Sequence, residues 1–220
     1  MAGEAKAALF DALAEVAKAL ANGRRAELID TLAQGERPVE ELAEIIGQSI
    51  ANTSQHLQRL LRAGLVTTRR EGTRIYYSLA SPAVYTLWRT MTETADRHVK
   101  DLDTLAEAFL GDRSGMQTIG RDELRARMRA GDVVVLDVRP DAEYQSGHIR
   151  GALSVPTSQL KARLSEIPSG LDIVAYCRGP YCVMADDAVR YLDRQGRQAI
   201  RLEGGYPEWA EEGRPVAAGH

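Results

Sequence analysis

Residues 172–185 read DIVAYCRGPYCVMA, and this stretch decides the fold of the second half of the chain. Its apolar, β-prone start ends at Cys177, and the Gly179-Pro180 dipeptide that follows is typical of a tight loop. Beyond the loop, apolar residues recur at helical spacing from Met184 until Gly196. The stretch therefore predicts a strand, a loop and a helix in succession.

Cys177 is the best candidate nucleophile in the chain. The backbone N–H groups of such a loop converge inward, and the N-terminus of the following helix adds about half a positive charge. Both effects favour a thiolate at Cys177 beside a bound anion. The only other cysteine, Cys182, either is a small buried apolar residue or resolves a persulfide or sulfenate on Cys177 through a disulfide or polysulfide bridge.

Two further motifs flank this loop. LDVRP at 136–140 and GHIRGA at 147–152 precede it, and LEGGYPEW at 202–209 follows it. Together the three stretches resemble the rhodanese family, in which a loop opened by cysteine carries sulfur as a persulfide. The resemblance implies a sulfur-handling site made of Cys177, Cys182, Arg178 and Arg139, with Gly179, Pro180, Tyr181 and Val183 in the substrate-binding loop.

Some of these positions leave alternatives open. Arg139 either forms a structural ion pair with Asp137 or faces the anion pocket. We expect His148 to pack and hydrogen-bond rather than catalyse, and Glu203, Tyr206 and Trp209 to build the wall behind the pocket. Cys182 stands where relatives commonly carry arginine, so the loop has lost a positive charge. This departure weakens the expectation of thiosulfate turnover but not that of sulfur binding.

The remaining apolar runs of the second half agree with an α/β fold. Residues 133–136, 173–176 and 199–200 are continuously apolar and alternate with helical stretches. Strands buried on both faces and separated by helices indicate a mostly parallel sheet. Ligands of such sheets collect at the carboxyl ends of the strands, where Cys177 and Asp137 lie.

The bulk properties are those of a two-domain protein. The chain has 220 residues, 44% of them hydrophobic, a formal charge of −3 and a pI near 5.9. These values exclude a generally basic nucleic-acid coat but not a local basic patch. We expect no membrane span and no signal peptide, and a pair of closely spaced cysteines is typical of a reducing compartment, so we predict a cytoplasmic protein.

The first half has the pattern of a winged helix-turn-helix. Amphipathic spacing predicts helices over 5–21, 24–33 and 38–47, and a fourth helix capped by Ser49 and ended by Gly64. The predicted inward stripe of the fourth helix is Ile50, Thr53, Leu57, Leu60 and Leu61. Residues 65–79 then predict a hairpin with a Glu-Gly turn.

This region is also locally basic. Between Ser49 and Ala80 there are five arginines and one acid, which is the charge pattern of a phosphate-binding face. Residues 49–66, ending SQHLQRLLRAGLV, resemble the recognition helix of the ArsR/SmtB repressors, and the resemblance implies a homodimer that binds a palindromic double-stranded DNA operator. The DNA-binding candidates are Asn52, Thr53, Gln55 and His56 on the helix, with Thr53 also in the inward stripe, and Arg59, Arg69, Arg70 and Arg74 toward phosphate.

A long helix is predicted over 82–110. Its apolar residues step by three or four positions from Val84 to Phe109, broken at His98, which suits a helix of a partner subunit. His98 resembles the start of a metal site that some ArsR/SmtB proteins carry, but further ligands are lacking in the sequence. We therefore expect no metal and no cofactor, and a hydrogen-bonded interface histidine instead.

These patterns predict two domains: a mainly α winged helix-turn-helix domain at 1–110 and, after a linker at 111–115, an α/β rhodanese-like domain at 116–220. The predicted function is that of an ArsR-type regulator, a repressor, whose second domain senses or carries sulfane sulfur at Cys177. The donor would be thiosulfate, polysulfide or a persulfide. The alternative is a sulfurtransferase whose first domain serves localisation and dimerisation; a metal-responsive repressor is weakened by the missing ligands.

Overall fold

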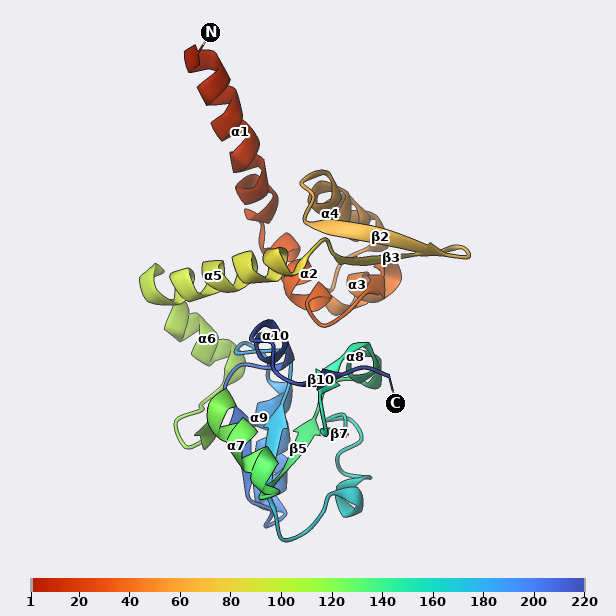
Figure 1. The fold of residues 1–220 in the computed structure, drawn as a ribbon, viewed down its shortest axis with the longest axis vertical. Helices are drawn as coiled ribbons and strands as arrows, with labels where there is room; N and C mark the ends of the chain where they lie inside the picture. Colours follow the sequence, from red (N-terminus) through yellow and green to blue (C-terminus); the bar gives the residue numbers. More distant parts are fainter. Residues whose placement is uncertain (1, 220) are drawn as a thin grey trace. The chain divides into compact units, whose positions relative to one another are not determined.

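The computed structural model describes residues 2–219, and the chain divides into two compact units between Arg97 and His98 (Figure 1). Each unit has its own buried apolar core. Across the residues described, no helix combines the length and the apolar character that crossing a membrane requires.

The first unit packs helices and a small sheet around one apolar core. It contains α1 (Ala2–Leu20), α2 (Gly23–Leu32), β1 (Arg37–Pro38), α3 (Val39–Ile45), α4 (Ile50–Arg62), β2 (Val66–Glu71), β3 (Arg74–Leu79) and α5 (Pro82–His98). The strands form an antiparallel sheet in the order β1-β3-β2. The core is closed by Leu28 and Ile29 of α2, Leu42 of α3, and Leu57 and Leu60 of α4, all 0% exposed.

Local signals set the limits of α4 and of the hairpin. The Ser49 side chain accepts a hydrogen bond from the Asn52 N–H, as an N-cap does, and Gly64 adopts φ +70° just after the helix ends. The hairpin turns at Gly72, with φ +59°, between β2 and β3. Helix-turn-helix and wing are thereby confirmed, but Ile50 is 52% exposed and does not belong to the predicted inward stripe.

The predicted helix over 82–110 is wrong as a single element. Helix α5 ends at His98, and α6 (Leu102–Leu110) begins after Asp101, which has a left-handed φ of +64°. An aspartate tolerates this conformation better than most residues, and it ends the helical hydrogen-bond pattern. The interruption coincides with the boundary between the two units, and α6 belongs to the second.

The second unit is built on a five-stranded parallel sheet. Its elements after α6 are β4 (Thr118–Ile119), α7 (Arg121–Ala130), β5 (Val133–Asp137), α8 (Asp141–Ser146), β6 (His148–Ile149), β7 (Leu153–Ser154), η1 (Leu164–Glu166), β8 (Asp172–Tyr176), α9 (Met184–Arg194), β9 (Ala199–Leu202), α10 (Tyr206–Glu211) and β10 (Val216–Ala217). The sheet order is β4-β9-β8-β5-β7, with every pair parallel, and β10 pairs antiparallel with β6. The mostly parallel α/β fold is therefore confirmed.

Both faces of this sheet are covered. Ile173 and Ala175 of β8 pack into the core that contains residues of α9, whereas Val174 and Tyr176 pack into the core that contains residues of α7 and α10. Alternate residues of one strand face opposite sides, so a continuously apolar run is needed where both sides are buried. Strands β5 and β8 are neighbours in register from Val133–Asp172 to Asp137–Tyr176, which brings Asp137 and Cys177 to the same edge of the sheet.

Candidate functional site

The cysteine loop lies between β8 and α9, at the carboxyl edge of the sheet. Cys177 is 0% exposed, Cys182 is half-buried, and both thiols are free. The Cys177 Sγ donates to the Cys182 carbonyl oxygen at 3.7 Å, and the two side chains lie close enough to shift each other's pKa. Backbone N–H groups of Gly179 and Ala185 point at Cys177, and those of Arg178 and Met184 point at Cys182. The convergence of amides on this loop agrees with the sequence prediction.

The pKa values of the two thiols are shifted in opposite directions. Burial raises the pKa of the Cys177 thiol well above its ordinary value. The hydrogen bond from Cys177 lowers the pKa of Cys182 to about 7, aided by two backbone amides and the Arg178 charge and opposed by burial. Since the two thiols interact, the first proton leaves the pair as a unit. Burial of Cys177 therefore opposes the thiolate that the sequence predicts there.

The two arginines predicted to hold an anion are both paired with carboxylates. Arg178 binds the buried Glu143 with Nη2–Oε1 at 2.6 Å and Nε at 3.1 Å from both carboxylate oxygens. Arg139 is 0% exposed, binds Asp137 with Nη2–Oδ2 at 2.5 Å and donates to the Gly147 carbonyl at 2.7 Å. Of the two interpretations of Arg139, the structural ion pair is correct, because its guanidinium is enclosed beside β5. The site therefore offers an incoming anion mainly amides.

Two other arginines, which the sequence did not indicate, fix the backbone of the loop. Arg113 donates to Asp186 Oδ2 at 2.6 Å, to the Pro180 carbonyl at 2.8 Å and to the Cys182 carbonyl at 3.1 Å. Arg201 of β9 donates to Asp186 Oδ1 at 2.7 Å and to the Gly179 and Pro180 carbonyls at 3.3 Å. Asp186 is itself 0% exposed. One buried carboxylate thus aligns two guanidinium groups on the carbonyls of the loop.

The backbone of the cysteine loop also packs closely against Gly205. A Cβ at Gly205 would lie 2.4 Å from the Cys177 carbonyl oxygen and 2.5 Å from the Gly179 nitrogen. The Tyr206 N–H donates to the same Cys177 carbonyl at 3.1 Å. The Gly-Gly pair in the downstream motif was a usable signal for this close approach, because only glycine fits there.

The remaining predicted positions of this domain have mixed outcomes. Tyr181 is 38% exposed at the tip of the loop, and Val183 precedes α9 without capping it by a side chain. His148 is buried, stacks on Tyr144 at 3.6 Å and contacts the Tyr144 carbonyl at 2.9 Å, a packing role. Glu203 is not part of the wall: it is exposed and accepts a hydrogen bond from Thr118 at 3.0 Å.

In the first unit, the predicted base-reading residues of α4 divide into two groups. Asn52 and Gln55 are exposed, as side chains that contact DNA must be. Thr53 is 0% exposed and its hydroxyl donates to the Ser49 carbonyl at 3.0 Å, so its assignment to DNA binding is wrong and its place in the inward stripe is correct. His56 is half-buried, and its pKa is lowered by burial and by the charges of Arg25, Arg59 and Arg24.

The wing carries its three arginines on exposed positions. Arg69 is bound by Glu36 at 2.5 Å and Glu71 at 2.7 Å and lies over the Tyr76 ring at 4.8 Å. The Arg70 Nε donates to the Gly72 carbonyl at 3.0 Å, and Arg74 is exposed beside the turn. Arg70 and Arg74 are thus better placed to meet phosphate than Arg69, whose charge is neutralised.

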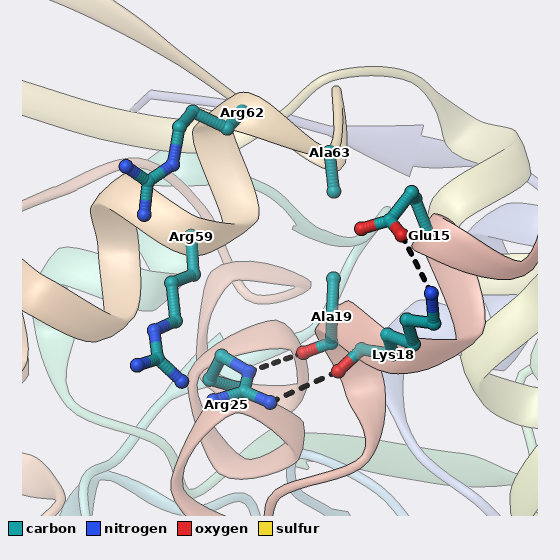
Figure 2. A pocket seen from close by; sticks show the side chains of 7 residues that line it. All are labelled: Glu15, Lys18, Ala19, Arg25, Arg59, Arg62 and Ala63. Atoms are coloured by element: carbon teal, nitrogen blue, oxygen red, sulfur yellow. Dashed lines mark hydrogen bonds and ion pairs between the residues drawn. The ribbon is translucent and has the colours of Figure 1, made fainter. Parts of the chain in front are cut away.

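A basic cavity of about 360 Å³ lies among α1, α2 and α4 (Figure 2). Its lining consists of Glu15, Lys18, Ala19, Arg25, Arg59, Arg62 and Ala63. Arg25 is buried and donates to the carbonyls of Lys18 and Ala19, which caps the end of α1. Glu15 pairs with Lys18 at 2.8 Å, so no lining carboxylate among the described residues is left for Arg59 and Arg62. Arg59 and Arg62 are thereby suited to a phosphate oxygen.

Several large apolar side chains are exposed on the helices. In α1, Leu9, Phe10 and Leu13 are 57%, 59% and 63% exposed, and Figure 1 shows the first half of α1 projecting from its unit. In α5, Val84 is buried and Trp88 donates to Asp30 at 3.0 Å, but Met91 is exposed. Exposed apolar stripes of this size mark surfaces that another chain covers.

For His98 the sequence predicts an interface histidine rather than a metal ligand. His98 is exposed at the end of α5. Within residues 2–219, no three His, Cys, Asp or Glu side chains are grouped so as to hold a metal ion.

Comparison with known proteins agrees with both units. The profile described as "Bacterial regulatory protein, arsR family" matches residues 22–68, and that of the "Rhodanese-like domain" matches residues 120–212. The chain is 49% identical to the HTH-type transcriptional regulator Rv0324 of Mycobacterium tuberculosis, over 100% of this chain and 97% of the relative. It is also 39% identical to a sulfurtransferase of Allochromatium vinosum, over 40% of this chain and 80% of the relative.

A solved structure covers the first unit. The homodimeric winged helix-turn-helix DNA-binding domain of Mb0332 from Mycobacterium bovis is 49% identical and covers 43% of this chain and 88% of its own, with a TM-score of 0.41. The full-length match and the two profiles together identify the protein: the chain belongs to the ArsR family of HTH-type transcriptional regulators and carries a rhodanese-like domain after its winged helix.

Proposed function

We propose that this regulator binds its operator as a homodimer, acts as a repressor, and receives sulfane sulfur on the Cys177–Cys182 pair, which changes its affinity for DNA. The observation that carries the sulfur part is the pair itself: two free, hydrogen-bonded thiols in a loop lined by amides. A low-pKa thiol beside a second thiol is the arrangement that accepts sulfane sulfur and resolves it. The donor is a polysulfide, a persulfide or thiosulfate.

Several features support operator binding by the first unit. Asn52 and Gln55 are exposed amides on the recognition helix, and amides can pair bidentately with adenine. Arg59 with Arg62 on α4, and Arg70 with Arg74 on the wing, offer exposed positive charge for phosphate contacts. Dimerisation is supported by the exposed apolar side chains of α1, since a second copy would cover them.

The wing is tested by the salt dependence of operator binding. In the variant Arg70→Ala/Arg74→Ala, four phosphate contacts per dimer are lost, and each contact contributes about 0.9 to the slope of log K against log salt. We expect the slope to fall by about 3 to 4, whereas the exposed Arg194→Ala of α9 should leave it unchanged. An unaltered slope in the double variant would contradict the wing assignment.

The coupling between sulfur and DNA is tested on one sample. The full-length protein is treated with inorganic polysulfide, and mass spectrometry and an operator gel shift are run on aliquots of it. We expect sulfur addition or a disulfide at the pair together with altered operator affinity, both absent in Cys177→Ser/Cys182→Ser. Sulfur addition with identical DNA binding would refute the sensing role and leave the binding of sulfur intact.

The second candidate function is enzymatic sulfur transfer. It is supported by the likeness between the second unit and the sulfurtransferase of Allochromatium vinosum. Against rapid turnover stand the ion pairs of Arg178 and Arg139, which leave little positive charge for thiosulfate. A cyanide-dependent thiosulfate assay separates the two functions, with Cys177→Ser as the control. Brisk turnover of thiosulfate would favour the enzyme. Slow transfer of sulfur to the protein without turnover would favour the regulator.

A further inference from the structure

We infer that the basic cavity among α1, α2 and α4 is a binding site for a small phosphorylated molecule, which it holds through the phosphate group. The cavity lies in the first unit, whereas the cysteine pair lies in the second, so the inference does not depend on the sulfur part of the proposed function. It assigns the regulator a second signal, which acts on the unit that carries the recognition helix.

The cavity has a local excess of positive charge. Four cationic side chains line it, those of Lys18, Arg25, Arg59 and Arg62, against one carboxylate, that of Glu15. Glu15 is bound to Lys18 at 2.8 Å, so it neutralises none of the three arginines. The chain as a whole has a formal charge of −3, which makes the excess a property of this place. A concave surface with one sign of charge attracts ions of the opposite sign.

The arginines of the cavity also have no carboxylate partners. Among the residues that the structure describes, Arg59 and Arg62 make no hydrogen bond or ion pair, and Arg25 donates only to the carbonyls of Lys18 and Ala19. The four guanidinium groups around the cysteine loop, by contrast, each bind a carboxylate. An unpaired guanidinium offers parallel N–H donors that match two oxygens of one phosphate group.

Arg25 is the fixed part of the site. Its side chain is 5% exposed, and its Nε and Nη2 are held by backbone carbonyls at the end of α1, so the orientation of the guanidinium is set before a ligand arrives. Burial and the nearby charge of Arg59 both lower the pKa of Arg25. Two cations are therefore crowded together here, and an anion between them would relieve their repulsion.

The size and walls of the cavity limit the ligand. Its volume of about 360 Å³ is at the low end of the range of about 300–1,000 Å³ for small-molecule sites, and exceeds what one phosphate group fills. Ala19 and Ala63 add a short apolar wall for the carbon atoms of an ester. Figure 2 shows Arg59 and Arg62 on α4 on one side of the cavity and Lys18 on α1 on the other, so a bound phosphate ester would contact both helices.

The same two arginines of α4 are offered to the operator backbone in the proposed function. A phosphate group of a small molecule and one of DNA have the same chemistry, so both are recognised by Arg59 and Arg62. The two ligands therefore compete, and the small molecule weakens operator binding.

The first arm of the test measures binding without DNA. The full chain is titrated by calorimetry with glycerol 3-phosphate and with inorganic phosphate at constant ionic strength, and glycerol and sodium chloride serve as the blanks. We expect saturable binding of both phosphates, at least about tenfold weaker in Arg59→Gln/Arg62→Gln because two charged donors are lost. Arg97→Gln, an exposed arginine of α5 outside the cavity lining, should bind as the wild type does, and circular dichroism checks the folding of both variants.

The second arm separates the two sources of phosphate. We expect glycerol 3-phosphate to weaken operator binding by the wild type and to have no effect on Arg59→Gln/Arg62→Gln. If neither phosphate binds and the double variant lowers the salt slope of operator binding by about 3 to 4, the cavity serves the DNA backbone alone. That result would overturn the inference and leave the proposed function in place. Phosphate binding that persists in the double variant would place the site elsewhere and overturn it as well.

Discussion

Cys177 and Cys182 share a loop and a hydrogen bond, and burial makes them different. Burial raises the pKa of the Cys177 thiol, and the neighbouring Cys177 side chain lowers the pKa of the Cys182 thiol to about 7. Neither effect is visible in the spacing of two cysteines along the chain. At the scale of single residues, the site is therefore a donor–acceptor pair in which each thiol sets the pKa of the other.

The reactivity of Cys182 should follow pH through the pKa of about 7. The thiolate fraction rises from about a tenth at pH 6 to about nine tenths at pH 8, so alkylation should accelerate by about tenfold over that range and then level off. The measurement is site-resolved iodoacetamide labelling at short times. In Cys177→Ala the stabilising hydrogen bond is gone, and the midpoint should move upward; an unmoved midpoint would show that Cys177 does not donate to Cys182.

Gly205 is the residue whose substitution should damage the loop most directly. A methyl group at Gly205→Ala would overlap the Cys177 carbonyl and the Gly179 nitrogen, both backbone atoms that cannot swing aside. We expect a loss of about 1–3 kcal/mol of stability in the second domain, as overpacking costs, measured by urea denaturation. Gly115→Ala, which meets nothing within 4 Å, is the matched control and should be close to neutral.

At the scale of elements, the carboxyl edge of the sheet gathers the loop and its supports. Cys177 directly follows β8, Arg201 lies in β9, and Arg113 lies in the segment before β4. Arg113 belongs to residues 111–115, which the sequence predicts to be the linker between the two domains. The cysteine loop is thus fastened to the same stretch of chain that leads into the domain.

Removal of the Arg113 side chain should loosen the loop. Arg113→Gln takes from the buried Asp186 one of its two arginine partners and from the Cys182 carbonyl a donor. We expect a loss of about 1–3 kcal/mol, measured by hydrogen exchange in 178–186, together with faster labelling of Cys177. Arg190→Gln removes contacts to the Asp112 carbonyl at 2.9 Å and Asp187 at 3.5 Å, both at the surface, and should cost under about 0.5 kcal/mol. Equal effects of the two substitutions would argue against a special role of Arg113.

At the scale of the whole molecule, we expect the exposed apolar stripe of α1 to form part of the dimer interface. Leu13→Glu places a charge among side chains that a second copy would bury, and the desolvation of that charge opposes association. We expect dimer affinity to fall at least about tenfold by sedimentation, with operator binding weakened in parallel. Ala8→Glu adds the same charge at an exposed position on the opposite side of α1 from Phe10 and Leu13 and should leave the dimer intact. Dimers that tolerate Leu13→Glu would place the interface elsewhere.

Much of this architecture follows from local patterns. The four-helix order and the wing follow from helical and alternating periodicity, the cap at Ser49 from its hydroxyl, and the parallel sheet from apolar runs between helices. The prediction of one helix over 82–110 is wrong for a local reason too. The apolar spacing continues past Asp101, but the left-handed backbone of that residue interrupts the helical hydrogen bonds.

By itself, the sequence determined the two folds, the family and the residues that open the cysteine loop, because each depends on neighbours within a few positions of the chain. The tertiary structure alone decided how deeply each cysteine is buried, which arginines are already neutralised and which hold the loop. Arg178 meets Glu143 across 35 positions and Arg113 meets Asp186 across 73, and no periodicity links residues so far apart. The physical reason is that burial and ion pairing depend on the packing of distant segments, whereas helices, strands and turns depend on local backbone preferences.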